Sequence, residues 1–288
     1  LKLDFLAVAD IFMTSTATLA DIVLPAATYL EFDSVEQPWT YPIASVQQKV
    51  AQVGESWPDG KILNELTKKL GFHDYAWADM QAPLDWILQA AGISFEEFRK
   101  IGYLVGHKVY RHYEKNGFET PSKKVQLYSN QLKEWGFDAL PEYVEPPETP
   151  VSEPACATEY PFILTSRKEG VFRHSTGRQI PSLRETKPDP IVKLHAKAAK
   201  KLGIDEGEWV AISTRRGSIR QKAQLVDWLD PRVVEVDYAC WFPEKGPSTL
   251  YGWDESNINV LLDNKPPHNR EMGSPSMRGV FCKIGKEI

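Results

Sequence analysis

The sequence has few cysteines, no long apolar run and no excess of positive charge. Its three cysteines, Cys156, Cys240 and Cys282, are far apart and form no Cys-x-x-Cys pair. This spacing argues against an iron–sulfur or zinc site within the 288 residues. The longest apolar stretches, such as residues 22–27, fall far below the roughly 20 residues that span a bilayer. The sequence therefore predicts no membrane span.

The charge balance argues against another class of partner. Lysine and arginine number 34, aspartate and glutamate 39, and the formal net charge is −5. Without a basic stripe to neutralise a phosphate backbone, a nucleic acid is not expected as a partner. The sequence also lacks a Ser-His-Asp arrangement, a GxxxxGK loop and an HExxH motif, so hydrolase, kinase and metalloprotease functions have no support.

The length and a change of composition predict two domains. Residues 136–161 contain six prolines among acidic residues, which predicts a stiff connector without regular secondary structure. We place the boundary there and expect domains of residues 1–154 and 155–288. Because the sequence opens with neither an initiator Met nor a signal peptide, we expect that its natural N-terminus is not included.

The first domain begins with two short apolar runs, residues 3–9 and 22–24, of the type found in buried parallel strands. This pattern predicts the end of an α/β sheet. Ligands bind beyond the carboxyl ends of strands in such sheets, so Asp10, Thr14 and Thr16 are candidate binding residues. The same three side chains could equally cap the turn that follows the strand.

Helices are expected after these strands. Apolar spacing predicts one with Asp59 as its N-cap, ending at Gly71. A second helix contains Leu84 and Leu88, and Ser94 begins a third with acidic residues in its first turn.

The second domain has the pattern of a β-barrel. Short β-type runs are separated by Gly, Pro and Asp, at residues 162–165, 210–214, 219–225, 233–236 and 279–284. One helix is expected among them, from Pro190 to Leu202, ending at Gly203. Gly217, between Arg216 and Ser218, predicts a tight hairpin.

Three stretches resemble one family over nearly the whole chain. Residues 10–31 carry Asp, an aromatic residue, Thr, Ala-Asp, Val-Leu-Pro and Glu in the family's order. Residues 117–129 are similar to a Thr-Pro-Ser-Gly-Lys stretch, with Lys123 at the usual glycine, which is expected to alter that turn. Barrel motifs follow between residues 160 and 261. Together they resemble the C-terminal third of the molybdopterin oxidoreductases, the dimethyl sulfoxide reductase superfamily.

The resemblance implies a fold class and a cofactor. The fold would be an α/β remnant plus a mostly β region, the C-terminal double-psi β-barrel of the molybdopterin-dinucleotide-binding type. The cofactor would be bis-molybdopterin guanine dinucleotide with molybdenum or tungsten. The family's metal ligand and [4Fe-4S] cysteines have no counterpart here, so both are expected only in a missing N-terminal part, and no catalytic residue or metal ligand is predicted in this segment.

The resemblance also assigns binding roles to individual residues. Cofactor-binding positions are Asp10, Thr14, Thr16, Arg167, Lys168, Glu169, Gly170, Val171, His174, Ser175, Asn259 and Arg278. Without the resemblance, Arg167 and Lys168 would be interpreted as a solvated hairpin tip and His174 as a structural histidine. Trp241 and Phe242 could line the site or simply pack in the core. Glu31 is interpreted as a structural partner of backbone or arginine groups.

The implied function is that of part of an oxidoreductase. The segment would bind and orient the pterin cofactor for two-electron or oxygen-atom transfer on a small substrate, and would be inactive by itself. Two alternatives stay open. One is a non-redox hydratase on the same scaffold, of the acetylene hydratase kind, and the other is a cofactor-binding subunit that docks on a catalytic or electron-transfer partner. We also expect residues 155–288 to fold independently, and residues 1–58 to be partly disordered without a preceding half.

Overall fold

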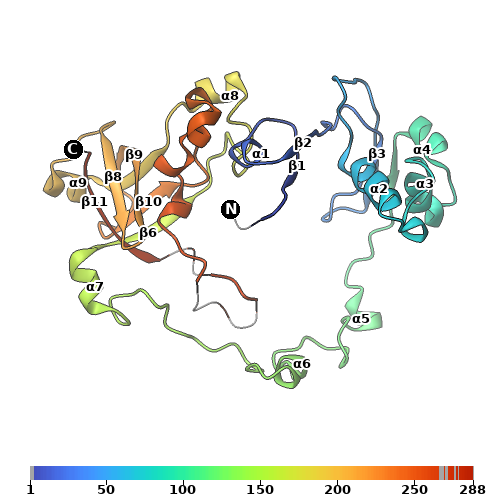
Figure 1. The fold of residues 1–288 in the computed structure, drawn as a ribbon. Helices are drawn as coiled ribbons and strands as arrows, with labels where there is room; N and C mark the ends of the chain where they lie inside the picture. The colour runs from blue at the N-terminus through green and yellow to red at the C-terminus, as the bar shows by residue number, and fades with distance from the viewer. Residues whose placement is uncertain (1–2, 266–268, 270–271, 276, 278, 288) are drawn as a thin grey trace. The chain divides into compact units, whose positions relative to one another are not determined.

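The computed structural model describes residues 3–265, 269, 272–275, 277 and 279–287 (Figure 1). Its contacts divide the chain into two compact units, Leu1–Val125 and Gln126–Ile288. The proline-rich connector belongs to the second unit because its Glu148 and Glu153 form ion pairs with Arg215 of the barrel. The expected boundary near residue 155 therefore differs from the division by contacts, which falls after Val125. The boundary between functional domains stays a prediction.

Two short parallel strands open the first unit, as the sequence predicts. Strand β1 (Ala7–Asp10) pairs with β2 (Ile22–Pro25), and Asp10 lies opposite Pro25 at their carboxyl ends. A four-residue helix, α1 (Ser15–Thr18), lies between them. The strand–connector–strand arrangement is thus confirmed, although β1 begins later than the expected run of residues 3–9.

A small antiparallel sheet with helices forms the rest of this unit. The strands, in sheet order, are β3 (Ser34–Glu36), β4 (Ile43–Gln47) and β5 (Tyr103–Val105). The helices are α2 (Asp59–Lys69), η1 (His73–Tyr75), α3 (Ala82–Leu88), η2 (Gln89–Ala91), α4 (Phe95–Ile101) and α5 (Tyr113–Asn116). Leu88, Phe95 and Phe98 are buried together against side chains of this sheet and form the apolar core between the helices and the sheet. Burial of three large side chains explains why the short helices α3 and α4 are held in place.

The N-cap predicted from the sequence is confirmed for α4 and is wrong for α2. Ser94 accepts from the Glu97 N–H while the Glu97 side chain accepts from the Ser94 N–H, so α4 begins with a capping box, as expected. The prediction of Asp59 as N-cap of α2 is wrong. Pro58 is the N-cap, and Asp59 is the first helical residue, where a carboxylate still interacts favourably with the helix dipole.

The connector contains more helix than its composition predicts. Helix α6 (Asn130–Glu134) lies just before it, and α7 (Pro154–Glu159) lies within it. The expectation that residues 136–161 hold no regular structure is therefore wrong for α7. Pro154 begins that helix, where a fixed φ suits the first turn and a missing N–H leaves no hydrogen bond unmade.

A closed six-stranded barrel is the core of the second unit, which confirms the expected barrel. Around the barrel the order is β10-β6-β11-β8-β9-β7. The strands are β6 (Phe162–Arg167), β7 (Ile191–His195), β8 (Trp209–Thr214), β9 (Gly217–Val226), β10 (Val233–Asp237) and β11 (Val280–Lys286). Helices α8 (Pro181–Thr186) and α9 (Ala196–Leu202) and the 3-10 segments η3 (Pro243–Lys245), η4 (Pro247–Glu255) and η5 (Ile258–Val260) complete the unit. Alternate residues of the strands, such as Val192, Leu194, Val234 and Val236, point into one apolar core.

The expected helix from Pro190 to Leu202 is only half correct. Residues 191–195 form strand β7, parallel to β9 and antiparallel to β10, and only residues 196–202 are helical. The alternation of Ile191, Val192, Lys193 and Leu194 buries every second side chain, which a barrel strand requires. Gly203 ends α9 in the left-handed conformation, as expected.

The hairpin at Gly217 is confirmed. The turn geometry, however, is not what requires a glycine at this position. Thr214 pairs with Gly217 across a loop of Arg215 and Arg216. A Cβ atom on Gly217 would lie 2.8 Å from the carbonyl oxygen of Val260. The glycine is therefore required because another backbone segment approaches it closely.

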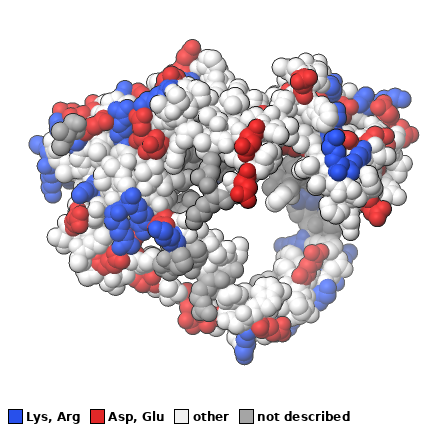
Figure 2. Space-filling model, viewed as in Figure 1, with Lys and Arg blue, Asp and Glu red and all other residues white. Residues whose placement is uncertain are grey.

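Two surface properties complete the description. None of the helices within the described ranges has both the length and the apolar character of a bilayer span. On the face shown in Figure 2, basic and acidic side chains are interspersed.

Candidate cofactor-binding site

Two loops leave the barrel from the carboxyl ends of neighbouring parallel strands. Strands β6 and β10 run parallel, with Arg167 opposite Asp237 at their ends. The chain continues into residues 168–180 after β6 and into residues 238–242 after β10, and we call these two segments the β6/β10 loop site. Loops held on a rigid scaffold are where backbone groups and polar side chains are free to meet a ligand.

An ion-pair network holds the base of this site. Arg167 Nε donates to Asp237 Oδ1 at 2.6 Å, and Arg167 also pairs with Glu169. Lys187 Nζ lies 3.1 Å from Glu169 and 3.7 Å from Asp237 Oδ2, which accepts from the Ile191 N–H as well. Asp237 is only 2% exposed, and a buried carboxylate requires such paired cations and donors.

This network decides between the interpretations of Arg167. A solvated hairpin tip is wrong for Arg167, whose side chain is enclosed by acidic partners, but it fits the neighbouring Lys168, which is exposed. Burial raises the pKa of Glu169, yet the hydrogen bond and charge of Lys187 and the charge of Arg167 outweigh it, so that the pKa lies below its ordinary value. Glu169 is therefore a carboxylate at neutral pH.

The two loops are joined by hydrogen bonds. The His174 N–H donates to the Tyr238 hydroxyl at 3.1 Å, and Trp241 Nε1 donates to the Ser175 carbonyl at 2.8 Å. His174 has φ of +54°, a left-handed conformation that is uncommon outside glycine. The turn at residues 173–176, whose side chains are all exposed, is thus fixed by its neighbours.

Arg178 is a second link that the sequence did not predict. It is 4% exposed, donates from Nε to the Ala239 carbonyl at 3.0 Å, and lies with its guanidinium over the Phe172 ring. Arg178 binds the far end of the first loop to the second loop and so positions the exposed turn between them. Its side chain faces protein groups rather than solvent.

The remaining barrel positions expected from the sequence lie at or near this end. Gly170, His174 and Ser175 are exposed, and Val171 is half-buried. Asn259 is exposed in η5, and its N–H donates to Asn257, whose amide in turn donates to the Cys240 carbonyl at 3.4 Å. Arg278 lies outside the described residues.

Trp241 and Phe242 are core-packing residues. Both are 5% exposed, and the Trp241 ring packs edge-on against Tyr251 with centroids 5.4 Å apart. Of the two roles left open by the sequence, the structure assigns them the structural one.

Asp10, Thr14 and Thr16 lie together in the first unit, just beyond β1. The Thr14 hydroxyl donates to Asp10 at 3.1 Å and accepts from the Ala17 N–H at 3.2 Å, as the N-cap of α1. Asp10 also accepts from the Phe12 N–H. The structure thus shows the capping role for Asp10 and Thr14, while Asp10 keeps unused acceptor capacity and Thr16 is exposed.

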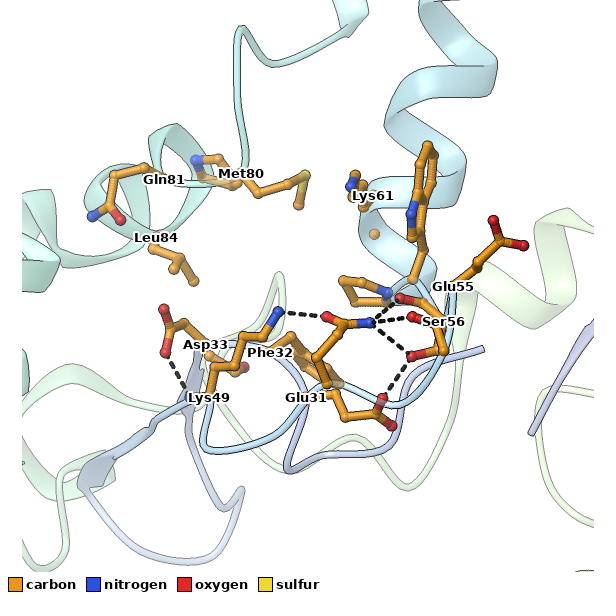
Figure 3. Close-up of a pocket in the computed structure, with 17 residues that line it drawn as sticks. Glu31, Phe32, Asp33, Lys49, Glu55, Ser56, Lys61, Met80, Gln81 and Leu84 are labelled. Carbon is orange, nitrogen blue, oxygen red and sulfur yellow. Dashed lines mark hydrogen bonds between the residues drawn. The ribbon is translucent and has the colours of Figure 1, made fainter. Parts of the chain in front are cut away.

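A cavity of about 570 Å³ lies elsewhere in the first unit (Figure 3). Glu31 and Ser56 lie on one side of it, with Met80 and Leu84 opposite. Glu31 accepts hydrogen bonds from the Ser56 hydroxyl at 2.6 Å, from the Thr28 N–H and hydroxyl, and from the Val53 N–H. These donors, Ser56 first, lower the pKa of Glu31 to about 2, which confirms its structural interpretation.

Two lysines line the same cavity, and both have partners. Lys49 Nζ donates to Gln52 at 2.6 Å, and Lys61 Nζ lies 3.8 Å from the centre of the Trp57 ring. The cavity wall is thus held by contacts within the protein.

The thiols do not provide a metal site. Burial raises the pKa of both Cys240 and Cys282 to about 12, and it also raises the pKa of Cys156. Thiolates are the form that binds metals, so these cysteines are poor ligands. Within the described ranges no three His, Cys, Asp or Glu side chains are grouped so as to hold a metal ion.

The β6/β10 loop site does fit a ligand rich in hydrogen-bond acceptors. Gln179, in the first of its loops, has a buried side-chain nitrogen that finds no partner among the described residues. Close by in sequence are the exposed hydroxyl of Ser175 and the exposed Lys168 and His174. Pterin carbonyls, phosphates and guanine present acceptors to such donors.

Comparison with known proteins identifies both halves of the chain. The family described as "Molydopterin dinucleotide binding domain" matches residues 162–278, and "Molybdopterin oxidoreductase" matches residues 1–69. Acetylene hydratase of Syntrophotalea acetylenica is 32% identical over 96% of this chain and 39% of its own length. A putative catalytic chain of dimethyl sulfoxide reductase from Halobacterium salinarum is 29% identical over 83% of this chain and 30% of its own.

A solved structure agrees. That of acetylene hydratase from Pelobacter acetylenicus matches with a TM-score of 0.89 at 32% identity, over 99% of this chain and 40% of that one. The chain thus spans about two fifths of the length of these acetylene hydratases. It belongs to the molybdopterin oxidoreductases of the dimethyl sulfoxide reductase superfamily and corresponds to their C-terminal portion, with the molybdopterin dinucleotide-binding domain.

Proposed function

We propose that this chain binds and orients a bis-molybdopterin guanine dinucleotide cofactor that carries molybdenum or tungsten. The observation that carries the proposal is the β6/β10 loop site, where loops from two parallel strands are fixed by hydrogen bonds and present exposed donors. A cradle that is rigid before binding loses little conformational entropy when the ligand arrives. The match to a molybdopterin dinucleotide-binding domain supports this choice of ligand.

The proposed binding residues divide by role. Lys168, His174, Ser175 and Asn259, which are exposed, would contact the dinucleotide directly. Arg167 and Glu169 would act mainly through the ion pairs that shape the loop. Gly170 and Val171 would contribute backbone groups. In the first unit, Asp10, Thr14 and Thr16 would contact a dinucleotide. The role of Arg278 stays a prediction from the family resemblance.

The bound cofactor would supply the two-electron or oxygen-atom chemistry on a small substrate. The residues of this chain would bind it, orient it and shield it from water. As the family resemblance implies, the metal ligand and any [4Fe-4S] cluster would come from a preceding part of the protein or from a catalytic or electron-transfer subunit. We accordingly expect the segment by itself to be inactive.

A non-redox hydratase is the second candidate. It is favoured by the likeness to acetylene hydratase, which extends over 96% of this chain in the sequence comparison and 99% in the structural one. The dimethyl sulfoxide reductase relative supports redox chemistry instead, at 83% coverage. The two functions would share the cofactor-binding role proposed for the loops.

The test is metal and pterin analysis of the natively purified protein, with any polypeptide that accompanies it. Elemental mass spectrometry would measure Mo, W and Fe, and fluorescence of the oxidised pterin would give the cofactor content. We expect Mo or W with about two pterins per metal. Protein from a cofactor-competent host that contains neither metal nor pterin would contradict the proposal and favour a docking subunit without cofactor. Assays for acetylene hydration and for reduction of sulfoxides would then separate the two reactions.

A further inference from the structure

One buried donor in the β6/β10 loop site has no partner. Gln179 Nε2 is fully buried, and no hydrogen-bond acceptor among the described residues reaches it. Buried amide groups are nearly always hydrogen-bonded, so an exception at a candidate site indicates an absent partner.

The neighbours of Gln179 exclude a simple local partner. Arg178 is committed to the Ala239 and Tyr238 carbonyls and to the Phe172 ring. Ile180 N–H donates to the Gly177 carbonyl, which closes the turn on which Gln179 lies. The turn that carries Gln179 is therefore held by hydrogen bonds on both sides of this residue.

Another buried glutamine in the same barrel shows what a structural amide looks like. Gln221 is 0% exposed, and its Nε2 donates to the carbonyls of Asp237 and Ser256 while its Oε1 accepts from the Asp237 N–H. All of its bonds are made within the protein. Gln179 differs from Gln221 in this respect: the residue is half-buried, and its buried Nε2 has no partner among the described residues.

We propose that Gln179 is a cofactor-recognition residue, whose amide nitrogen donates to an acceptor atom of the pterin dinucleotide. The inference rests on the function proposed above and adds a residue that the family resemblance did not assign. Suitable acceptors are a ring carbonyl, a ring nitrogen or a phosphate oxygen. The Gln179 donor would complement the exposed Ser175 and His174 on the same loop.

The test uses Gln179→Met and Gln179→Glu in the natively purified protein with its accompanying polypeptides. Methionine keeps the length of the side chain and removes the donor, whereas glutamate presents an acceptor and a negative charge. Gln131→Met is the control, because Gln131 is exposed in α6. Pterin fluorescence and guanine nucleotide released by acid would be measured after gel filtration, together with thermal unfolding of each variant.

The expected result for Gln179→Met is an unchanged or higher unfolding temperature of the cofactor-free protein, since an unsatisfied group has been removed. Retention of pterin and guanine nucleotide should fall about three- to tenfold, the value of one neutral hydrogen bond, and further in Gln179→Glu. The control should match the wild type in both measurements.

Three outcomes would overturn the inference. Wild-type protein with bound pterin and a Gln179→Met variant that retains as much would remove the recognition role but leave the proposed function intact. A Gln179→Met variant that unfolds earlier in the cofactor-free state would show a structural amide instead. Wild-type protein without pterin would overturn the proposed function itself, and this inference with it.

Discussion

The side-chain amide of Gln221 pairs with both backbone groups of Asp237, accepting from its N–H at 3.0 Å and donating to its carbonyl at 2.9 Å. This contact links strand β9 to the end of β10 through the barrel interior. The Asp237 side chain then pairs with Arg167 and Lys187 under the candidate site. A fully satisfied buried amide thus fixes the residue on which the loop geometry depends.

Gln221→Met is expected to destabilise the barrel by about 3 kcal/mol, because it removes the amide partner of the buried Asp237 N–H and Ser256 carbonyl and leaves the Asp237 carbonyl with only the weak thiol donor of Cys240. Urea unfolding of the second unit, followed by tryptophan fluorescence, would measure the change. Gln224→Met is the matched control on the same strand, since Gln224 is only half-buried. Equal stability of the Gln221 and Gln224 variants would contradict the structural role of Gln221.

Arg167 and Lys168 are adjacent in sequence but should differ in mutational effect. Arg167→Met removes a cation from the buried Asp237, and we expect a loss of about 3–5 kcal/mol in unfolding free energy. Lys168→Met leaves that network intact, and we expect it to lower cofactor retention without a loss of stability. Comparing urea unfolding with bound pterin for the two variants checks both statements. A stability loss in Lys168→Met equal to that in Arg167→Met would argue against this division of roles.

The contrast between these two residues also shows how far the sequence could predict the site. It predicted β6 and β10, and hence the loops that follow them, because alternating apolar runs bounded by Pro and Asp are a local pattern. It could not predict that Arg167 binds Asp237, 70 residues later. Nor did local patterns identify Arg178, whose partners lie 60 to 62 residues away. The strand-end argument applied to Asp10 would have indicated Asp237 as well.

One correction has a similar origin. Residues 191–195 were predicted as the start of a helix, although Ile191 and Val192 are β-branched, and their pairing with β9 and β10 makes them a strand. Lys123, at the family's usual glycine, was expected to alter its turn. Its φ is +57°, so the lysine itself adopts the left-handed conformation that glycine favours, while its carbonyl accepts from the Phe118 N–H. Whether this turn differs from that of the family stays a prediction.

Acid should weaken the first unit through Glu31. The pKa of Glu31 is lowered to about 2 in the folded state, against about 4.3 for an unperturbed glutamate. A lowered carboxyl pKa contributes stability that is fully present above the unfolded value and is lost as pH falls from about 4 toward 2. We expect Glu31→Gln to be less stable than wild type at pH 7 and to lose less stability between pH 5 and 2.5. Thermal unfolding across this range would measure it, with Glu36→Gln, an exposed glutamate of the same unit, as control.

The ion pairs of Glu148 should protect the connector from proteolysis. Glu148 is 3% exposed and pairs with Arg216 and with Arg215, the latter at 2.8 Å. Burial raises its pKa, but the hydrogen bond and charge of Arg216 and the charge of Arg215 outweigh this, and the pKa lies below its ordinary value. A charged Glu148 therefore binds the connector to the β8–β9 hairpin.

Glu148→Gln should leave both arginines without their buried partner and free the connector. We expect limited elastase digestion to cut residues 136–154 several-fold faster than in wild type, while the barrel from residue 155 onward stays intact. Glu142→Gln, at an exposed position of the same connector, should behave as wild type. Mass spectrometry of the fragments would locate the cuts. Cleavage within the β6–β11 barrel at the same rate as in the connector would contradict both the protective ion pairs and the independent folding of the barrel, because a closed barrel with a continuous core offers a protease no extended segment.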